Sequence, residues 1–294
     1  MAAEVSAQAR AGTGSRTAGQ VAGSASRMSA RFAPYRAVIG SRVRAQRTYR
    51  VSFALDLFGA LLVGLVELGE MWVILHNVRV LGGLDFPAVL MVFGLSNMTF
   101  SLADMLVGHV DGLPRFIREG TLDAFYLRPQ PVLAQLMTAE ISLRRLSRVS
   151  VGAVAFGVGM ARGGVAWDPG KVAVLALGLV AGTAIFAGVF VLAAGVQFFL
   201  IDGSEVTNSF TYGGAYASAQ PASVFPSPLV LVFGFLVPVV FTGYLPVLWL
   251  LGLPGAALLP SWLAWFTPVA AAWTWLLAMV MWRQGTRHYQ GAGG

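Results

Sequence analysis

Long apolar stretches alternate with short polar segments between Val51 and Trp282. A helix that spans a bilayer needs about 20 predominantly apolar residues, and six stretches approach or exceed that length. They cover residues 51–75, 84–109, 147–166, 172–201, 227–250 and 267–282. The pattern predicts an all-α polytopic membrane protein with about six transmembrane helices, gathered in one transmembrane domain at residues 51–290.

Composition supports this prediction. Of the 294 residues 56% are hydrophobic and only 11% are charged, whereas a soluble domain has about 25% charged residues. The mean hydropathy is +0.71. The chain contains no cysteine, which excludes disulfides, thiol catalysis and cysteine-ligated metals.

The N-terminal region is predicted to stay outside the bilayer. Residues 1–33 are rich in Ala, Gly, Ser and Arg, and we expect a disordered cytoplasmic tail. Residues 34–50 carry apolar side chains on one helical face and arginines around the rest, which suggests a basic interfacial helix on anionic headgroups. A plain basic flank that anchors the first span is the alternative.

Arginine placement predicts the orientation. With the N-terminus in the cytoplasm, 17 of the 20 Lys and Arg residues lie on the cytoplasmic side, and Arg79, Arg162 and Lys171 lie outside. This is the positive-inside distribution. We therefore expect a multi-pass protein of the plasma (inner) membrane with both termini in the cytoplasm. Because the arginines flank the spans, the net charge of +7 is attributed to orientation, and no nucleic-acid partner is expected.

Polar side chains form a stripe on each of the first two spans. Buried carboxylates are costly in lipid, so each stripe should face protein or water. One reading is the lining of a substrate route, and the other is contact between helices. The candidates are Asp56, Glu67, Glu70, Asn97, Ser101 and Asp104.

Proline and glycine shape the later spans. Pro238 should bend the fifth span because it lacks a backbone donor. Gly178 and Gly182 have the spacing that lets helices approach closely. Residues 252–266 combine Gly and Pro with tryptophans, and we expect an outer re-entrant hairpin of two half-helices there. An ordinary outer loop is the alternative.

No catalytic constellation is found. The three histidines are far apart, and neither HExxH nor GxSxG occurs. The run from Gly164 to Lys171 is one residue too long for a Walker A motif, and Val172 replaces the hydroxyl residue that holds the metal. We expect no catalytic, cofactor-binding or metal site, so an ATP-driven transporter would need a separate ATPase subunit.

The segment between the second and third spans mixes apolar and charged residues. Apolar Phe116, Ile117, Leu122 and Phe125 alternate with Arg115, Arg118, Glu119, Asp123 and Arg128. A turn at Gly120 should separate two short helices, leaving a knob that docks into a groove on a partner protein. The alternative is a connector that lies on lipid.

Three motifs carry a family resemblance. They are I-x-x-G-x-L-D-x-x-x-L-R-P (Ile117–Pro129), F-x-x-P-V-V-F-x-x-Y-x-P (Phe235–Pro246) and W-R-x-G-x-R-x-Y-Q-G-x-G (Trp282–Gly293). Together they resemble the permeases of type-2 ABC exporters, in the branch known as ABC-2 family transporter protein. The chain departs from the family where a Tyr-Pro pair is expected before the fifth span.

The resemblance implies a half-transporter that moves an amphiphilic or drug-like substrate outward by alternating access. Two cytosolic ATPase subunits would bind ATP and Mg, and a second permease, identical or a sister subunit, would complete the route. The coupling residues would be Arg115, Phe116, Ile117, Arg118, Gly120, Leu122, Asp123, Arg128 and Pro129, and Pro238, Tyr244 and Pro246 would shape the fifth span.

Three other functions stay open. A proton-coupled secondary transporter could use the acids of the first span, although no internal repeat is visible. A membrane-embedded enzyme would need clustered polar residues at one depth. A non-transporting scaffold is the third alternative.

Overall fold

The computed structural model describes residues 50–78, 80–139, 142, 145–200 and 204–289. The predicted tail at 1–33 and all of the predicted interfacial helix except Arg50 lie outside these residues. The long helices are α2 (Arg50–Asn77), α3 (Phe86–Val107), α7 (Leu146–Arg162), α8 (Pro169–Gln197) and α12 (Thr267–His288). They confirm the all-α class, and each overlaps a predicted span.

Shorter elements connect the long helices. They are α4 (Leu113–Arg118), α5 (Asp123–Tyr126), α6 (Val132–Ala139), α9 (Ser204–Ser218), α10 (Ser227–Leu231) and α11 (Tyr244–Leu251). Two-residue strands, β1 (Gly255–Ala256) and β2 (Leu259–Pro260), pair antiparallel and are the only strands among the described residues.

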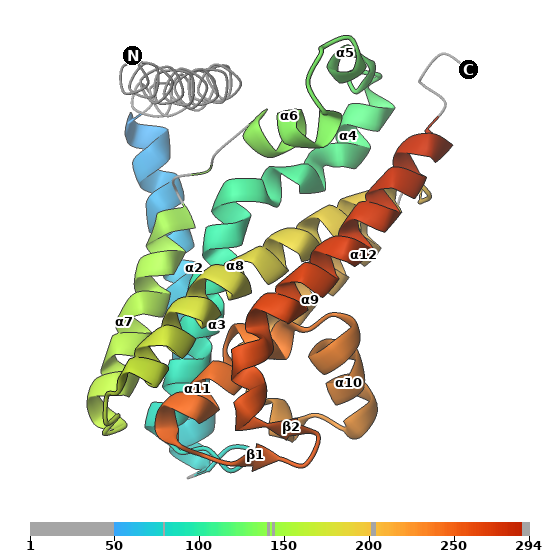
Figure 1. Cartoon of the computed structure of the whole chain (residues 1–294). Helices are drawn as coiled ribbons and strands as arrows, with labels where there is room; N and C mark the ends of the chain where they lie inside the picture. The colour runs from blue at the N-terminus through green and yellow to red at the C-terminus, as the bar shows by residue number, and fades with distance from the viewer. Residues whose placement is uncertain (1–49, 79, 140–141, 143–144, 201–203, 290–294) are drawn as a thin grey trace, which may run out of the picture. The chain divides into compact units, whose positions relative to one another are not determined.

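Helix α3 is the centre of the bundle. It packs against α7 and α8, while α12 runs along α8 and α2 lies against α7 (Figure 1). Glycines allow the close approach, since a methyl group added at Gly94 would lie 2.6 Å from the carbonyl oxygen of Gly152. Large apolar side chains such as Val180 and Leu276 stay exposed on the outside, as expected of a surface that contacts lipid.

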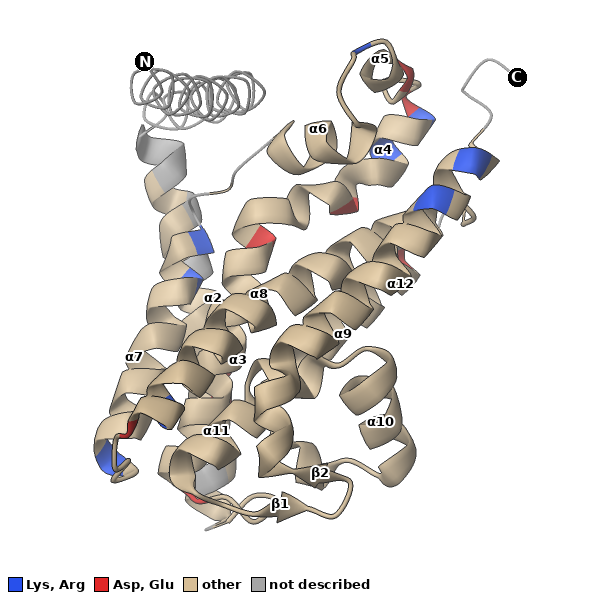
Figure 2. Ribbon diagram, in the orientation of Figure 1, with Lys and Arg blue, Asp and Glu red and all other residues tan. Residues whose placement is uncertain are grey.

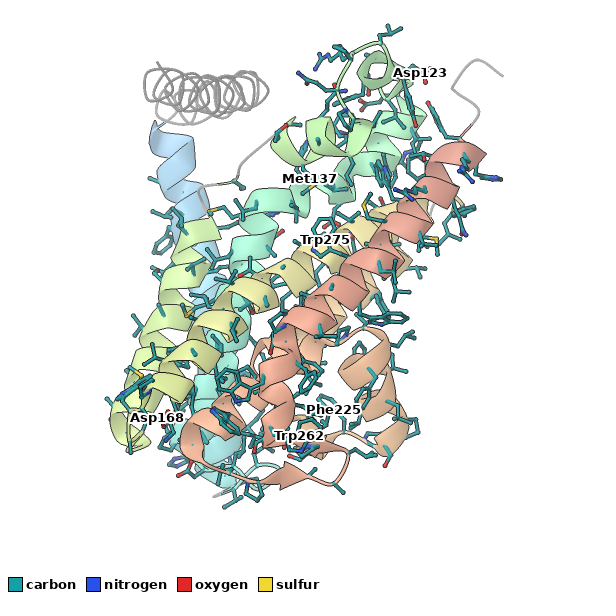
Figure 3. All side chains as sticks on the ribbon, viewed as in Figure 1. Asp123, Met137, Asp168, Phe225, Trp262 and Trp275 are labelled. Carbon is teal, nitrogen blue, oxygen red and sulfur yellow. The ribbon has the colours of Figure 1, made fainter. Side chains whose placement is uncertain are left out.

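The two ends of the bundle differ. Figure 2 shows blue and red segments gathered at α4, α5 and the end of α12, with few in the middle of the long helices. We call this the charged end, and the end with β1, β2 and α11 the hairpin end. In Figure 3 Asp123 lies at the charged end, and Asp168 and Trp262 lie at the hairpin end.

The fifth crossing differs from the prediction. Residues 202–226, expected as a cytoplasmic loop, contain α9, which begins near the C-terminal end of α8, where Gln197 donates to the Thr207 hydroxyl at 2.8 Å. Ser96, midway along α3, donates to the Ser218 carbonyl at 2.7 Å. Ser223 then reaches the Gly82 carbonyl in the turn between α2 and α3. The chain thus crosses the bundle here.

The predicted fifth span at 227–250 is instead a re-entrant hairpin. The helix breaks around Val237 and Pro238 and again at Gly243, where φ is −145°. A methyl group at Gly182, midway along α8, would meet Thr242, whereas one at Gly163, at the hairpin end, would meet Leu251. The chain therefore enters from the hairpin end, turns midway and returns.

The segment 252–266, expected to form the re-entrant hairpin, reaches less far into the bundle than residues 227–250. It contains β1, β2 and a 3₁₀ helix from Ser261 to Phe266 in place of two half-helices. Trp262 and Trp265 are exposed there, as is common for tryptophan at a membrane interface. The broken backbone explains why residues 227–250, and not 252–266, form the re-entrant hairpin. Pro238 and Gly243 together interrupt a helix that would otherwise be a full span.

Four helical segments are long and apolar enough to cross a membrane among the described residues, namely 57–74, 86–118, 169–197 and 261–288. Helix α7 has 17 residues and α9 has 15, and both are anchored by packing against the longer helices. With α9 taking the fifth crossing, the chain still passes between the two ends six times. The segment 202–226 contains no Lys or Arg, so the count of flanking charges is unchanged.

The α3–α7 contact gives a first prediction. Replacing Gly94 by Ala should lower stability by about 2 kcal/mol, because the added methyl group meets backbone atoms of α7 that cannot move aside. Thermal unfolding of the purified chain measures the effect. Gly157→Ala on α7 is the matched control, since its added methyl group meets nothing within 4 Å. Equal melting temperatures for the two variants would contradict the packing described.

Candidate functional site

A cavity of about 180 Å³ lies between α2, α3 and α9, beside the start of α7. Its walls are largely aromatic and apolar, with a few charged and amide side chains. Three of the six predicted route residues line it: Glu67, Glu70 and Asn97. The other lining residues are Met71, Phe93, Ser96, Phe100, Arg148, Tyr212, Ala215, Tyr216, Ala219 and Gln220.

Glu67 is the centre of a polar network. Its carboxylate accepts from the Arg148 guanidinium at 2.7 Å and from the Asn97 amide at 3.1 Å. The Arg148 guanidinium also lies over the Phe100 ring, 5.8 Å from its centroid. The network joins α2, α3 and α7, so Glu67 both faces the cavity and holds three helices together. Glu67 thus makes the contact between helices, and its position on the cavity wall is the one that a substrate route would require.

Glu70 has a different environment. Its carboxylate accepts a hydrogen bond of 2.5 Å from the Tyr216 hydroxyl on α9, and the residue is exposed. A carboxylate on a membrane-spanning helix must face water or protein. Glu70 therefore marks the open side of the cavity.

Of the remaining predicted route residues, Ser101 and Asp104 have described side chains and do not line the cavity. Asp104 is buried and forms an ion pair with Arg145, which ties α3 to the start of α7. Ser101 is buried, and its hydroxyl has no partner among the described residues. The side chain of Asp56 lies outside the described residues. For Asp104 the structure favours contact between helices.

Sequence reasoning missed the partners of the acids. The positive-inside distribution treats Arg148 as a charge that flanks a span, and Tyr212, Tyr216 and Gln220 lie between the predicted fourth and fifth spans. The tyrosines at 212 and 216 are four residues apart, the spacing that places two side chains on one face of a helix. That spacing was the available signal.

Tyr212 connects the cavity with the charged end. Its ring packs edge-on against Phe100, and its hydroxyl donates to Asp111 at 3.2 Å. Asp111 belongs to the 3₁₀ turn Gly108–Gly112, which leads directly into α4. Helix α4 is therefore connected to the cavity wall through one hydrogen bond as well as along α3.

The segment between α3 and α7 has the predicted helix–turn–helix form. Helix α4 ends at Arg118, Gly120 adopts φ +66° in the turn, and α5 follows. Leu122 is fully buried beneath the turn, and Phe116 packs edge-on against Phe125. Only glycine adopts the left-handed conformation here without strain. We call α4, the turn, α5 and the following residues to Pro129 the knob.

Exposed residues of the knob carry mixed chemistry. Leu127 is 88% exposed, the highest fraction among the exposed large apolar side chains that the structure describes. Asp123, Arg115, Arg128 and Pro129 are exposed as well, and Ile117 is half-buried. Arg115 and Arg128 lie over the rings of Phe116 and Phe125, at 5.4 Å and 5.7 Å. Sequence reasoning did not single out Leu127.

The C-terminal segment contacts the knob directly. The Tyr289 hydroxyl donates to the Asp123 carboxylate at 2.8 Å, and its ring stacks on Tyr126 with the planes 9° apart. Burial and the neighbouring Asp123 raise the pKa of Tyr289 to about 12, so the phenol remains a donor at any cellular pH. Two of the three sequence motifs thus meet in one contact.

The helix-shaping residues lie in and beside the re-entrant hairpin. Pro238 marks its break, and Tyr244 begins α11 with 3% of its surface exposed. Pro246 packs against Gly178, where an added methyl group would lie 3.2 Å from its ring. The described residues contain no group of three or more potential metal ligands.

The comparisons with known proteins give one match. A family model described as ABC-2 family transporter protein matches residues 61–293, which include α3 to α12, the knob and the cavity. No curated protein and no solved structure matches the chain.

Removing one partner of the Glu67 network should cost more than removing both. Glu67→Ala leaves the Arg148 guanidinium without its partner, and Arg148→Ala does the same to the carboxylate, each at a cost of about 2 kcal/mol for a part-buried bond between charged groups. The double variant should be destabilised by less than the sum. Thermal unfolding of the three variants measures this coupling. Purely additive losses would show that the pair does not interact.

The Tyr289 contact should hold α5 in place. Tyr289→Ala removes both the hydrogen bond and the stacked ring, and Tyr289→Phe removes only the hydrogen bond, worth about 1 kcal/mol. Hydrogen–deuterium exchange in residues 119–131 should accelerate about fivefold in the Phe variant, since 1.4 kcal/mol is tenfold, and more in the Ala variant. Arg287→Ala is the control. Unchanged exchange in both tyrosine variants would refute the contact.

Proposed function

The chain belongs to the ABC-2 family of transporter proteins, and we propose that it is the membrane half of an ATP-driven exporter. It is a membrane-embedded transporter permease, and such permeases are not themselves the catalytic component. ATP and Mg would be bound by two copies of a cytosolic ATPase. The observation that carries the proposal is the knob, which projects exposed apolar and charged residues from the end of a cavity-lining helix.

The knob suits a protein groove better than a lipid surface. Leu127 offers an apolar anchor, and Asp123, Arg115 and Arg128 surround it with both signs of charge. Interfaces commonly combine an apolar core with a polar rim. Carboxylates would be disfavoured against anionic headgroups. We therefore assign the knob to the ATPase and the charged end to the cytoplasm, which agrees with the positive-inside distribution.

Two connections would carry the ATPase stroke to the cavity. One is covalent, from the knob through the Gly108–Gly112 turn into α3, which bears Asn97 and Phe100. The other is the Asp111–Tyr212 hydrogen bond to α9. Alternating access needs the cavity walls to have two arrangements whose populations ATP shifts. Helix α9, being short and polar, is the wall that we expect to move.

A second permease would cover the open side of the cavity. Tyr212, Gly213 and Tyr216 on α9 are exposed, as is Glu70 on α2. Polar surface of this kind is not stable against hydrocarbon. A second permease, identical or a sister subunit, would place two such surfaces around one central route. The apolar and aromatic walls favour an amphiphilic or drug-like substrate, moved outward.

A proton-coupled secondary transporter is the second candidate, because carboxylates line the cavity. The Glu67 network argues against it. Protonating Glu67 would leave the Arg148 guanidinium without its counter-ion. Transport that survives ATP depletion but stops when the proton gradient collapses would favour this candidate over the exporter.

The coupling assignment is tested by Leu127→Ser in the chain expressed with the products of its neighbouring genes. We expect an ATPase to co-purify with the wild-type chain and at least tenfold less of it with the variant, because an anchor residue typically contributes 2 kcal/mol or more. Arg128→Glu and Asp123→Arg should separate ATP hydrolysis from transport. Leu258→Ser, at an exposed leucine of the hairpin end, is the control.

Two results would refute the proposal. If no ATPase co-purifies with the wild-type chain, the exporter assignment fails. If Leu127→Ser, Arg128→Glu and Asp123→Arg all assemble and transport normally, the knob is not the coupling element.

A further inference from the structure

The charges around the cavity do not balance. Glu67 is neutralised by Arg148 and further held by Asn97. Glu70 receives only the Tyr216 hydroxyl, and within the described ranges no Lys or Arg pairs with it. The described lining therefore carries two carboxylates and one guanidinium. The surplus negative charge lies at Glu70, on the open side of the cavity.

Gln220 provides an independent observation. Its side chain lines the same cavity and is only 8% exposed. Its amide forms no hydrogen bond with any part of the chain that the structure describes. The amide atoms are not enclosed by protein but reach the cavity surface, so a group that enters the cavity can form a hydrogen bond with them.

The size and walls of the cavity define what enters. Pockets that enclose drug-sized ligands have volumes of about 300–1,000 Å³, and this cavity has about 180 Å³. It therefore accommodates a head group, while the rest of the ligand extends through the open side. Phe93, Tyr212 and Tyr216 are among the residues that line the space, and aromatic rings attract cations and the carbon atoms next to them.

We propose that this cavity binds the protonated primary or secondary amine of an amphiphile, with Glu70 as its counter-ion. One N–H of the ammonium group would donate to the Glu70 carboxylate and another to the Gln220 carbonyl oxygen. The aromatic walls would contact the adjoining carbon atoms. An anionic head group would meet Glu70 with no second cation among the described lining residues to offset it. This assignment rests on the proposed transport function and narrows its substrate class.

Three probes of equal chain length test the proposal on the full chain in nanodiscs, without ATP or ATPase. They are octylamine, 1-octanol and octanoate, measured by titration calorimetry with empty nanodiscs subtracted. We expect octylamine to bind at least tenfold more tightly than either of the others. This comparison uses the wild-type chain, so it does not depend on the folding of any variant.

Glu70→Gln removes the charge but keeps an acceptor for Tyr216, and it should weaken octylamine binding about tenfold, the usual effect of losing a hydrogen bond to a charged group. Gln220→Met should weaken it by a similar factor. Glu205→Gln, an exposed carboxylate of α9 away from the cavity, should leave affinity unchanged. Equal affinity for the three probes, or unaltered octylamine binding by Glu70→Gln, would overturn the proposal.

The two proposals can fail separately. If an ATPase co-purifies but the probes bind equally, the exporter stands and the amine assignment falls. If octylamine binds selectively but no ATPase co-purifies, the cavity assignment stands and the exporter falls.

Discussion

A hydrogen-bonding or charged group inside a bilayer must find its partner within the protein, because the hydrocarbon offers none. The bundle is organised around this constraint. Glu67, Arg148 and Asn97 join α2, α3 and α7, and the Asp104–Arg145 pair joins α3 to α7 a second time. Glycines then let the same helices approach until backbone atoms nearly touch, so that packing and polar contacts act together.

The same constraint explains where sequence reasoning succeeded. Helices α2, α3, α8 and α12 were predictable because a long apolar run directly indicates a helix that spans a bilayer. Helix α9 is not predicted because Ser, Thr, Asn and Tyr dominate it, and because its partner Ser96 is distant in sequence. Hydropathy describes a segment in isolation, whereas α9 is stabilised by what it contacts.

The hairpin illustrates a different limit. A break at Pro238 was predictable, but its depth depends on Gly243 fitting against Ser96 and on Thr242 fitting against Gly182. Of the site, Glu67, Glu70 and Asn97 were predictable from their helical stripes. Their partners Arg148 and Tyr216 were not, because pairing across helices requires the tertiary arrangement.

The knob and the cavity are connected through α3 and α9, which are attached to the bundle in different ways. Helix α3 is rigidly packed and continues into the knob, whereas α9 is attached through single hydrogen bonds at Asp111, Glu70 and Ser96. The α3 wall of the cavity is therefore more closely packed than the α9 wall, which also bonds to Gln197 of α8. The hydrogen bond of Tyr289 to Asp123 further joins α5 to the end of α12.

Helix α7 also sets a condition on the surrounding lipid. Its 17 residues span roughly 25 Å at 1.5 Å per residue, which is less than the roughly 30 Å of a typical hydrocarbon layer. Lipid beside a short helix thins, or water follows the flanking charged residues inward. Arg145 and Arg148 lie at the N-terminal end of α7. The thickness of the bilayer therefore acts on the Glu67 network from outside the protein.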